Sequence, residues 1–202
     1  MHKPKLLLID NEDSFTFNLL QLFEEAGAEI HIVHPAKINT AQALLFDAAV
    51  ISPGPGLPEE MQNLLPLIQN LEKKMPLLGI CLGHQAIAMN YGGKLFQMNN
   101  IFHGRQLEIT HYSGKLFRDI PAEINVGLYH SWAVDNDSIP DCFEVTAISS
   151  EGIIMAIEHR ELPVFGLQFH PESYITRETG STIAKNFLSV VEEHKTSKTE
   201  KD

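Results

Sequence analysis

One cysteine in the middle of the chain stands where an apolar strand gives way to a helix. The run Pro76-Leu-Leu-Gly-Ile80 predicts a buried strand, and His84 to Asn90 has the pattern of the first turns of a helix. Between them, Cys81 is flanked by Gly79 and Gly83. Small residues at these two positions permit a strained turn that lifts a reactive side chain clear of the sheet. The stretch therefore predicts a strand, an elbow and a helix.

The position of Cys81 has two interpretations. Free cysteine is among the residue types most often buried, so the first interpretation is a packed core residue. The second is a nucleophile, because a core position has no need of glycines on both sides, whereas an elbow does. The N-terminal end of a helix also stabilises a thiolate through its unpaired backbone N–H groups and its dipole. The partners of Cys81 decide between the two.

The first half of the chain alternates predicted strands and helices. Besides the strand before Cys81, near-continuous apolar runs predict strands at Lys5–Asp10, Glu29–Val33 and Ala48–Ser52. Helical spacing predicts helices at Phe15–Ala26, with Asp13 or Ser14 as the cap and Gly27 as the end, and at Asn39–Phe46. A further helix is expected at Glu59–Lys74, with a break or restart at Pro66, which suits the first turn of a helix. This alternation implies right-handed crossovers and a parallel sheet.

The second half is rich in short β segments. Strands are expected at Ile101–His111, Ile124–Val134, Phe143–Ser149, Ile153–His159 and Val164–His170, followed by an amphipathic helix around Ile183–Val191. With 202 residues and 44% hydrophobic content, residues 1–194 are expected to form a single α/β domain. Its fold would be an open, mostly parallel sheet flanked by helices, with a β-rich second half. The charged segment 195–202 is expected to be a disordered tail.

Composition excludes several classes of function. The formal net charge of −11 disfavours a nucleic-acid or anionic-membrane surface, since both need clustered Lys and Arg. Two cysteines, Cys81 and Cys142, are too few for a disulfide scaffold. The apolar run Leu6–Ile9 is too short for a signal-peptide core or a membrane span. A cytoplasmic protein with reduced thiols is expected.

Proline and glycine alternate in Pro53-Gly54-Pro55-Gly56, directly after a predicted strand. The ordinary interpretation of such a run is a rigid surface turn. This turn, however, follows the carboxyl end of a strand, as Cys81 does, and such ends form the ligand crevice of an open α/β sheet. Glycine N–H groups there, with the N–H of Leu82 after the nucleophile, would stabilise an oxyanion.

Among ten histidines, His170 has the most informative neighbour. Pro171 restrains the preceding residue to extended geometry, in which His170 and Glu172 would share a face. A carboxylate beside imidazole fixes its tautomer and stabilises imidazolium. The alternative is a solvated polar pair, but the elbow and the glycine turn together favour a triad with Cys81. No histidine has metal-ligand spacing, so no metal site is expected.

Three blocks together resemble the class I (triad) glutamine amidotransferases, a flavodoxin-like family. They are Gly79-Ile-Cys-Leu-Gly-His-Gln85, Ser52-Pro-Gly-Pro-Gly-Leu-Pro58 and Gln168-Phe-His-Pro-Glu-Ser173. Three more blocks are similar to the glutaminase subunits of chorismate-using synthases, namely anthranilate synthase component II and its para-aminobenzoate synthase counterpart. These blocks are Asp10–Leu19, His103–Arg105 and Tyr129–Trp132. The resemblance spans the chain from the first strand to the last helix.

The resemblance implies a role for each matching residue. Cys81 would attack the side-chain amide of L-glutamine, His170 would pass a proton to the leaving ammonia, and Glu172 would hold His170. The implied oxyanion donors are Gly56 and Leu82, and the implied substrate-binding residues are Gly54, Pro55, Gly56, Gln85, Ser131 and Trp132. No cofactor is implied on this subunit, and magnesium is expected on the chorismate-binding synthase subunit (component I) that receives the ammonia.

The expected activity is the glutaminase of anthranilate synthase, in tryptophan biosynthesis. The alternative is aminodeoxychorismate synthase, in folate biosynthesis, or a subunit shared by both. Two further hypotheses are a free-standing γ-glutamyl hydrolase and a non-catalytic regulatory subunit, although the second would typically lack Cys81 or His170. Two positions depart from the family pattern: Glu12 replaces a common tyrosine, and Trp132-Ala133 replaces an aliphatic pair.

Overall fold

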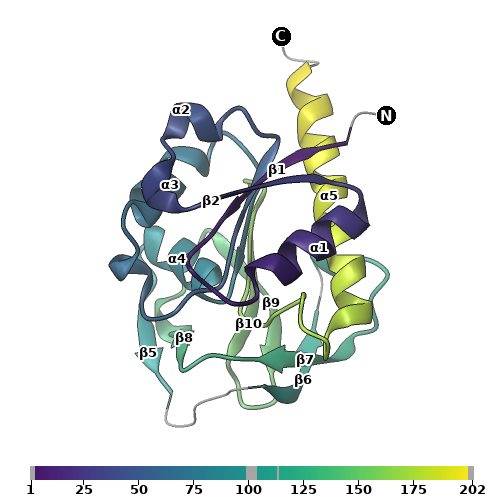
Figure 1. The fold of residues 1–202 in the computed structure, drawn as a ribbon. Coiled ribbons are helices and arrows are strands. Elements are labelled where there is room, and N and C mark those ends of the chain that lie inside the picture. The colour runs from purple at the N-terminus through teal and green to yellow at the C-terminus, as the bar shows by residue number, and fades with distance from the viewer. Residues whose placement is uncertain (1–2, 99–103, 113, 200–202) are drawn as a thin grey trace.

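The computed structural model describes residues 3–98, 104–112 and 114–199. Nine of the described strands form one sheet in the order β2-β1-β3-β4-β11-β10-β9-β6-β7, and β5 and β8 form a small second sheet (Figure 1). The strands are β1 (Lys5–Ile9), β2 (Glu29–Val33), β3 (Ala48–Ile51), β4 (Leu77–Ile80), β5 (Leu95–Gln97), β6 (Arg105–His111), β7 (Glu123–Leu128), β8 (Trp132–Val134), β9 (Phe143–Ser149), β10 (Ile154–His159) and β11 (Val164–Leu167). The α-helices are α1 (Thr16–Ala26), α2 (Thr40–Ala43), α3 (Leu64–Leu71), α4 (Leu82–Asn90) and α5 (Arg177–Thr199).

The large sheet is parallel on one side and antiparallel on the other. Strands β2, β1, β3, β4 and β11 run parallel, whereas β10, β9, β6 and β7 continue the sheet in antiparallel pairs. The predicted open sheet flanked by helices is confirmed, and the β-rich second half extends this sheet. Because β4 lies between β3 and β11, the carboxyl ends of three parallel strands meet at one edge.

Both faces of the parallel strands are buried, which explains their uninterrupted apolar sequences. In β1, Leu6 and Leu8 join the core beneath α1 and α5, while Leu7 and Ile9 join the core beneath α3 and α4. None of the four is more than 1% exposed. Figure 1 shows α1 and α5 together on one side of these strands, away from α3 and α4. A strand buried on both faces needs apolar residues at every position rather than alternate ones.

Helix ends agree with the sequence pattern in one case and differ in another. Gly27 ends α1 in a left-handed conformation with φ of 111°, as predicted. The start of α1 is different, because Phe15 occupies the N-cap position and no side chain caps it. Asp13 instead accepts a hydrogen bond at 2.7 Å from the N–H of Phe15, the residue before the helix. The predicted Asp13 or Ser14 cap is therefore wrong.

Some elements are shorter than their patterns. The predicted helix at Glu59–Lys74 is reduced to a 3₁₀ turn at Pro58–Glu60 and α3, in which Pro66 occupies the first turn as expected. Residues 101–103 of the predicted strand Ile101–His111 lie outside the described residues, and β6 covers the rest from Arg105.

The charged C-terminal segment does not follow its prediction. Residues 195–199, expected to be disordered, continue α5 as helix, while residues 200–202 lie outside the described part of the chain. Two contacts with the body of the protein hold this end. The ammonium of Lys195 lies 3.0 Å from an Asp47 carboxylate oxygen, and Lys198 donates to the Lys74 carbonyl at 2.6 Å. Such tertiary contacts are invisible to local composition.

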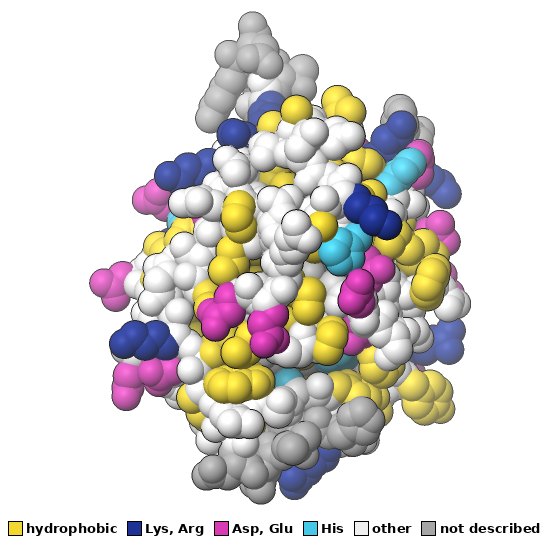
Figure 2. Space-filling model, turned by 60° about the vertical axis from the view of Figure 1, so that its left-hand side comes forward, with side chains coloured by type: hydrophobic (Ala, Val, Ile, Leu, Met, Phe, Trp, Pro, Cys, Tyr) yellow, Lys and Arg dark blue, Asp and Glu magenta, His cyan; other side chains and the backbone are white. Residues whose placement is uncertain are grey.

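Two observations concern the helices and one face of the described part of the protein. No helix in the described ranges is long and apolar enough to cross a membrane. Figure 2 shows one face of the molecule, on which Lys and Arg side chains are scattered toward the margins and do not gather into a patch. This view agrees with the acidic net charge of −11.

Candidate active site

Cys81 occupies a strained elbow between β4 and α4. Its backbone has φ of 51° and ψ of −103°, a region that costs a non-glycine residue on the order of 1–3 kcal/mol. The Cys81 N–H donates to the Leu167 carbonyl of β11 at 2.7 Å and anchors the turn. A side chain on Gly83 would place its Cβ 2.5 Å from the Ile51 carbonyl oxygen, so only glycine fits. The predicted strand, elbow and helix are confirmed, with the helix starting at Leu82, earlier than expected.

His170 and Glu172 lie side by side just beyond β11. The imidazole Nδ1 is 2.7 Å from a Glu172 carboxylate oxygen, and both side chains are buried. The sequence pattern predicted that His170 and Glu172 share a face because the chain there would be extended. In the structure the two side chains are adjacent because the segment is a turn. The strand ends at Leu167, and the Ser173 N–H donates back to the His170 carbonyl at 3.2 Å. This tight turn folds the carboxylate back onto the ring.

The His170 ring is enclosed on its remaining sides. Phe15 and Tyr129 contact it edge-on, with ring centroids 5.3 and 4.9 Å away. Its Nε2 is buried, and none of the described residues forms a hydrogen bond of regular geometry with it. The polar group beside Nε2 is the Cys81 thiol. Burial disfavours the charged ring, but Glu172 and Cys81 outweigh burial and hold the pKa of His170 well above 6.5. The raised pKa favours the charged form of the ring beside the cysteine.

A small cavity of about 140 Å³ opens over Cys81. Its walls come from the turn after β3, the elbow, the start of α4 and the loop before β8. The lining residues are Gly54, Pro55, Gly56, Cys81, Leu82, Gln85, Tyr129, His130, Ser131 and Trp132. The structure thus gathers at one place every residue for which the sequence predicted substrate binding or an oxyanion N–H. The Leu82 N–H begins α4 and has no intrahelical acceptor.

The segment after β1 anchors the start of the glycine turn. Asn11, fully buried, donates its backbone N–H to the Ser52 hydroxyl at 2.9 Å and its side-chain amide to the Ser52 carbonyl at 2.8 Å. A Cβ on Gly54 would lie 2.7 Å from the Asn11 Cβ, which leaves room for glycine only. The sequence pattern assigned no role to Asn11. Glu12 next to it is exposed and lies 3.6 Å from His34, away from the cavity walls.

A chain of amide hydrogen bonds runs beneath the cavity. Gln85 donates from Nε2 to the Trp132 carbonyl at 2.8 Å and to the Gln168 side-chain oxygen at 3.2 Å. The Gln168 amide in turn points its Nε2 at the Cys81 sulfur, 3.6 Å away. His130 Nδ1 is also 2.9 Å from the Trp132 carbonyl. Protein groups therefore occupy that carbonyl.

Two buried histidines lie close to the elbow. His84, on the first turn of α4, is fully buried, and burial and then the neighbouring His130 lower its pKa to about 3 despite a contact with the Gly166 backbone. Burial likewise lowers the pKa of His130 to about 4, opposed by its bond to Trp132. Both rings are neutral in the folded protein at neutral pH.

The depressed pKa of His84 predicts a loss of stability in mild acid. The unfolded chain binds this proton near pH 6.5 and the folded chain only near pH 3, so the contribution is complete above pH 6.5 and declines as the pH falls toward 3. At pH 5 the loss is about 2 kcal/mol for His84. Urea unfolding at pH 7.5 and pH 5 measures it.

His84→Asn, which cannot ionise, should lose about 2 kcal/mol less than the wild type between these two pH values. The matched control is His31→Asn, at a half-exposed surface position, which should leave the difference between the two pH values unchanged. Equal pH dependence in the wild type and His84→Asn would contradict the prediction.

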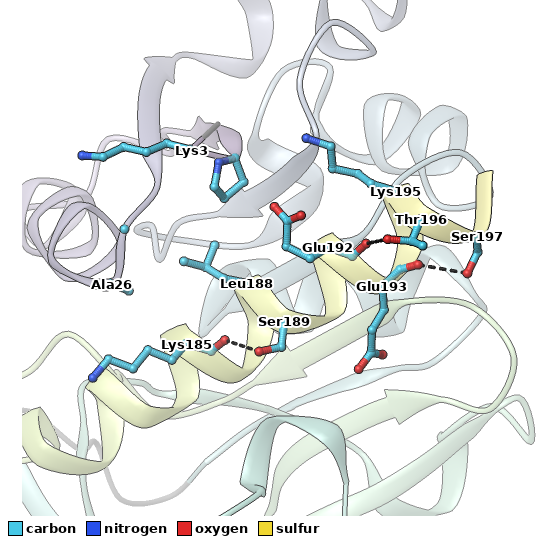
Figure 3. A pocket seen from close by; sticks show the side chains of 12 residues that line it. Lys3, Ala26, Lys185, Leu188, Ser189, Glu192, Glu193, Lys195, Thr196 and Ser197 are labelled. Atoms are coloured by element: carbon cyan, nitrogen blue, oxygen red, sulfur yellow. Dashed lines mark hydrogen bonds between the residues drawn. The ribbon is translucent and has the colours of Figure 1, made fainter. Parts of the chain in front are cut away.

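A much larger cavity, of about 1010 Å³, lies between the N-terminal segment and α5 (Figure 3). Its hydroxyl groups are engaged within the helix, since Ser189, Thr196 and Ser197 donate to the carbonyls four residues earlier, as the dashed lines show. Its lining contains neither cysteine nor histidine. In the described ranges, no group of three or more His, Cys, Asp and Glu side chains is placed to hold a metal ion. The cavity over Cys81 is the better candidate.

The fold and this site define a class: an α/β protein with a cysteine on a strand-to-helix elbow at the ligand-binding edge of its sheet. Residues 7–190 match the family described as glutamine amidotransferase class-I, and the chain belongs to this family.

Similar proteins cover nearly the whole chain. Aminodeoxychorismate synthase component 2 of Escherichia coli is 43% identical over 185 residues, which span 91% of this chain and 98% of that protein. Anthranilate synthase component 2 of Azospirillum brasilense is 42% identical over 187 residues, 91% and 95% of the two chains. The crystal structure of a glutamine amidotransferase from Thermotoga maritima has the same fold, with a TM-score of 0.74, 18% identity, and coverage of 95% and 99%.

Proposed function

We propose that this chain is the glutaminase subunit of anthranilate synthase, which hydrolyses L-glutamine and passes ammonia to a chorismate-binding synthase subunit. One observation carries the proposal: the buried pair of His170 and Glu172, 2.7 Å apart, lies beside the strained Cys81 elbow. Membership of the glutamine amidotransferase family supports glutamine as the substrate.

The proposed reaction assigns one task to each group. The Cys81 thiolate attacks the side-chain amide carbon of glutamine, and the carbonyl oxygen becomes an anion that the N–H groups of Gly56 and Leu82 stabilise. The His170 imidazolium protonates the amide nitrogen as the C–N bond breaks, while Glu172 stabilises the charged ring. Ammonia leaves, and water, deprotonated by neutral His170, hydrolyses the glutamyl thioester to glutamate. Gly54, Pro55, Gln85, Ser131 and Trp132 would surround the substrate in the cavity.

The product chemistry implies a partner. Free ammonia is mostly protonated in water at neutral pH and is then no nucleophile, so a synthase subunit must receive it along a shielded path. The proposed reaction uses no cofactor on this chain, and we place magnesium on the synthase subunit.

A second candidate, glutamine supply to aminodeoxychorismate synthase, is favoured by a specific observation: relatives of nearly equal identity bear either name. The test is to combine the full chain with each chorismate-binding component, glutamine and chorismate, adding the lyase that the aminodeoxychorismate route requires. Accumulation of ortho-aminobenzoate only with the anthranilate component supports our proposal. Para-aminobenzoate alone would overturn it in favour of the second candidate, and both products would mean a shared subunit.

The same assay addresses the remaining alternatives. Rapid turnover of γ-glutamyl peptides by the chain alone, unaffected by either synthase, would identify a free-standing hydrolase. Complete absence of glutamine turnover with both partners would identify a non-catalytic subunit.

A further inference from the structure

Gln168 is a buried polar residue that contacts the candidate nucleophile. It follows β11 directly, it is fully buried, and its side-chain nitrogen is 3.6 Å from the Cys81 sulfur. The Cys81 N–H bonds to the Leu167 carbonyl at 2.7 Å, so the backbones that carry the two side chains are tied together. A buried amide beside a sulfur atom costs free energy unless it makes hydrogen bonds.

The orientation of the Gln168 side-chain amide is fixed by hydrogen bonds that begin at the Trp132 carbonyl. A backbone carbonyl can only accept hydrogen bonds, so the bond of 2.8 Å at Trp132 requires the NH₂ end of Gln85. That same NH₂ group lies 3.2 Å from Gln168, which must therefore present its oxygen there. The remaining end of the Gln168 amide, its NH₂ group, faces Cys81. Reversing Gln85 would set its oxygen against the Trp132 carbonyl, and reversing Gln168 would set its NH₂ group against that of Gln85, in a buried site.

We propose that Gln168 is a positioning residue that holds the Cys81 sulfur by donating a hydrogen bond to it, and that Gln85 sets the direction of that bond. The inference rests on the proposed function, in which the thiolate of Cys81 is the nucleophile. Hydrogen bonds to a charged acceptor are stronger than those to a neutral one, so the contact stabilises the thiolate more than the thiol. Gln168 then acts on one side of the sulfur and His170 on another.

The proposal also redefines Gln85. Both contacts of its NH₂ group are with protein acceptors, so its free oxygen is the atom available to a ligand. A substitution at Gln85 should therefore alter the reactivity of Cys81 even toward a reagent that the glutamine site does not recognise.

The experiment measures alkylation of Cys81 in the full chain by iodoacetamide across a range of pH, with peptide mapping to separate Cys81 from Cys142. Gln168→Met keeps the length of the side chain and removes the donor. We expect alkylation near pH 7 to slow by about tenfold and the pH midpoint of the reaction to rise by about one unit. Gln85→Glu, which cannot donate to Gln168, should shift the midpoint in the same direction, and the double variant should shift it by less than the sum.

Gln42→Met is the matched control, because Gln42 completes the capping box of α2 and does not line the cavity over Cys81. An unchanged midpoint in folded Gln168→Met would overturn the inference and leave the proposed function standing. If that variant does not fold, Gln168→Leu, which is also neutral and lacks the donor, gives the same test. Failure of the proposed function would give a different result: the wild-type chain with its synthase would show no glutamine turnover.

Discussion

Replacing Cys81 with alanine should abolish glutamine-dependent product formation by the assembled synthase and leave the reaction with added ammonium intact. The chain would still fold and dock, because alanine fits wherever cysteine does, and the synthase subunit would still receive ammonia from solution. Loss of the nucleophile in a triad enzyme lowers turnover by roughly 10⁴- to 10⁶-fold. The two activities are measured in parallel, with glutamine or an ammonium salt as the nitrogen source.

Cys142→Ala is the matched control, since Cys142 is the other cysteine and lies outside the cavity. It should retain both activities. Loss of both activities in folded Cys81→Ala would contradict the assignment of Cys81 to glutamine hydrolysis alone. Retention of the glutamine-dependent activity would exclude Cys81 as the nucleophile.

Replacing Glu172 with glutamine should lower glutamine turnover by roughly 10³- to 10⁴-fold with little change in the KM for glutamine. The carboxylate accepts from His170 Nδ1 at 2.7 Å and raises the pKa of the ring. Without it, burial lowers the pKa of His170, so the protonated ring that serves the leaving ammonia becomes scarce at neutral pH. Steady-state kinetics over a range of pH measure both effects, and the variant should keep more of its activity at low pH.

Glu178→Gln offers a control for this change. Glu178 lies on the same segment, in the first turn of α5, but its side chain is exposed. It should leave turnover within about twofold of the wild type. A fall of less than tenfold for Glu172→Gln would show that Glu172 does not orient the catalytic histidine.

Much of the fold follows from local pattern. Apolar runs without polar alternation located the parallel strands, because strands such as β1 are covered on both faces. Gly27 and Pro66 marked a helix end and a first turn for steric reasons. Local pattern could not give the length of α5, because Asp47 and the Lys74 carbonyl, which contact its last turns, lie far away in the sequence.

Local sequence motifs predicted part of the site, but not the contacts that depend on the tertiary fold. The glycines beside Cys81 and the spacing of His170, Pro171 and Glu172 gave recognisable motifs, whereas the order of the strands could not be predicted. That β11 lies beside β4, which brings Gln168 to Cys81, depends on a pairing between segments about 87 residues apart. Asn11 is a similar case, since its partner Ser52 follows a different strand, β3. The sequence blocks that contain Asn11 and Gln168 could be recognised, but the contacts of these two residues could not be predicted.

In the proposed reaction, the Cys81 sulfur is the nucleophile that bonds to the side-chain amide carbon of glutamine. The most direct measurement treats the full chain, with and without its synthase subunit, with 6-diazo-5-oxo-L-norleucine, an electrophile that mimics glutamine, and maps the modified peptide by mass spectrometry. We expect a single adduct on Cys81 that appears in proportion to lost glutaminase activity and is prevented by excess L-glutamine. Loss of activity with Cys81 unmodified, or an adduct on Cys142 in its place, would contradict it.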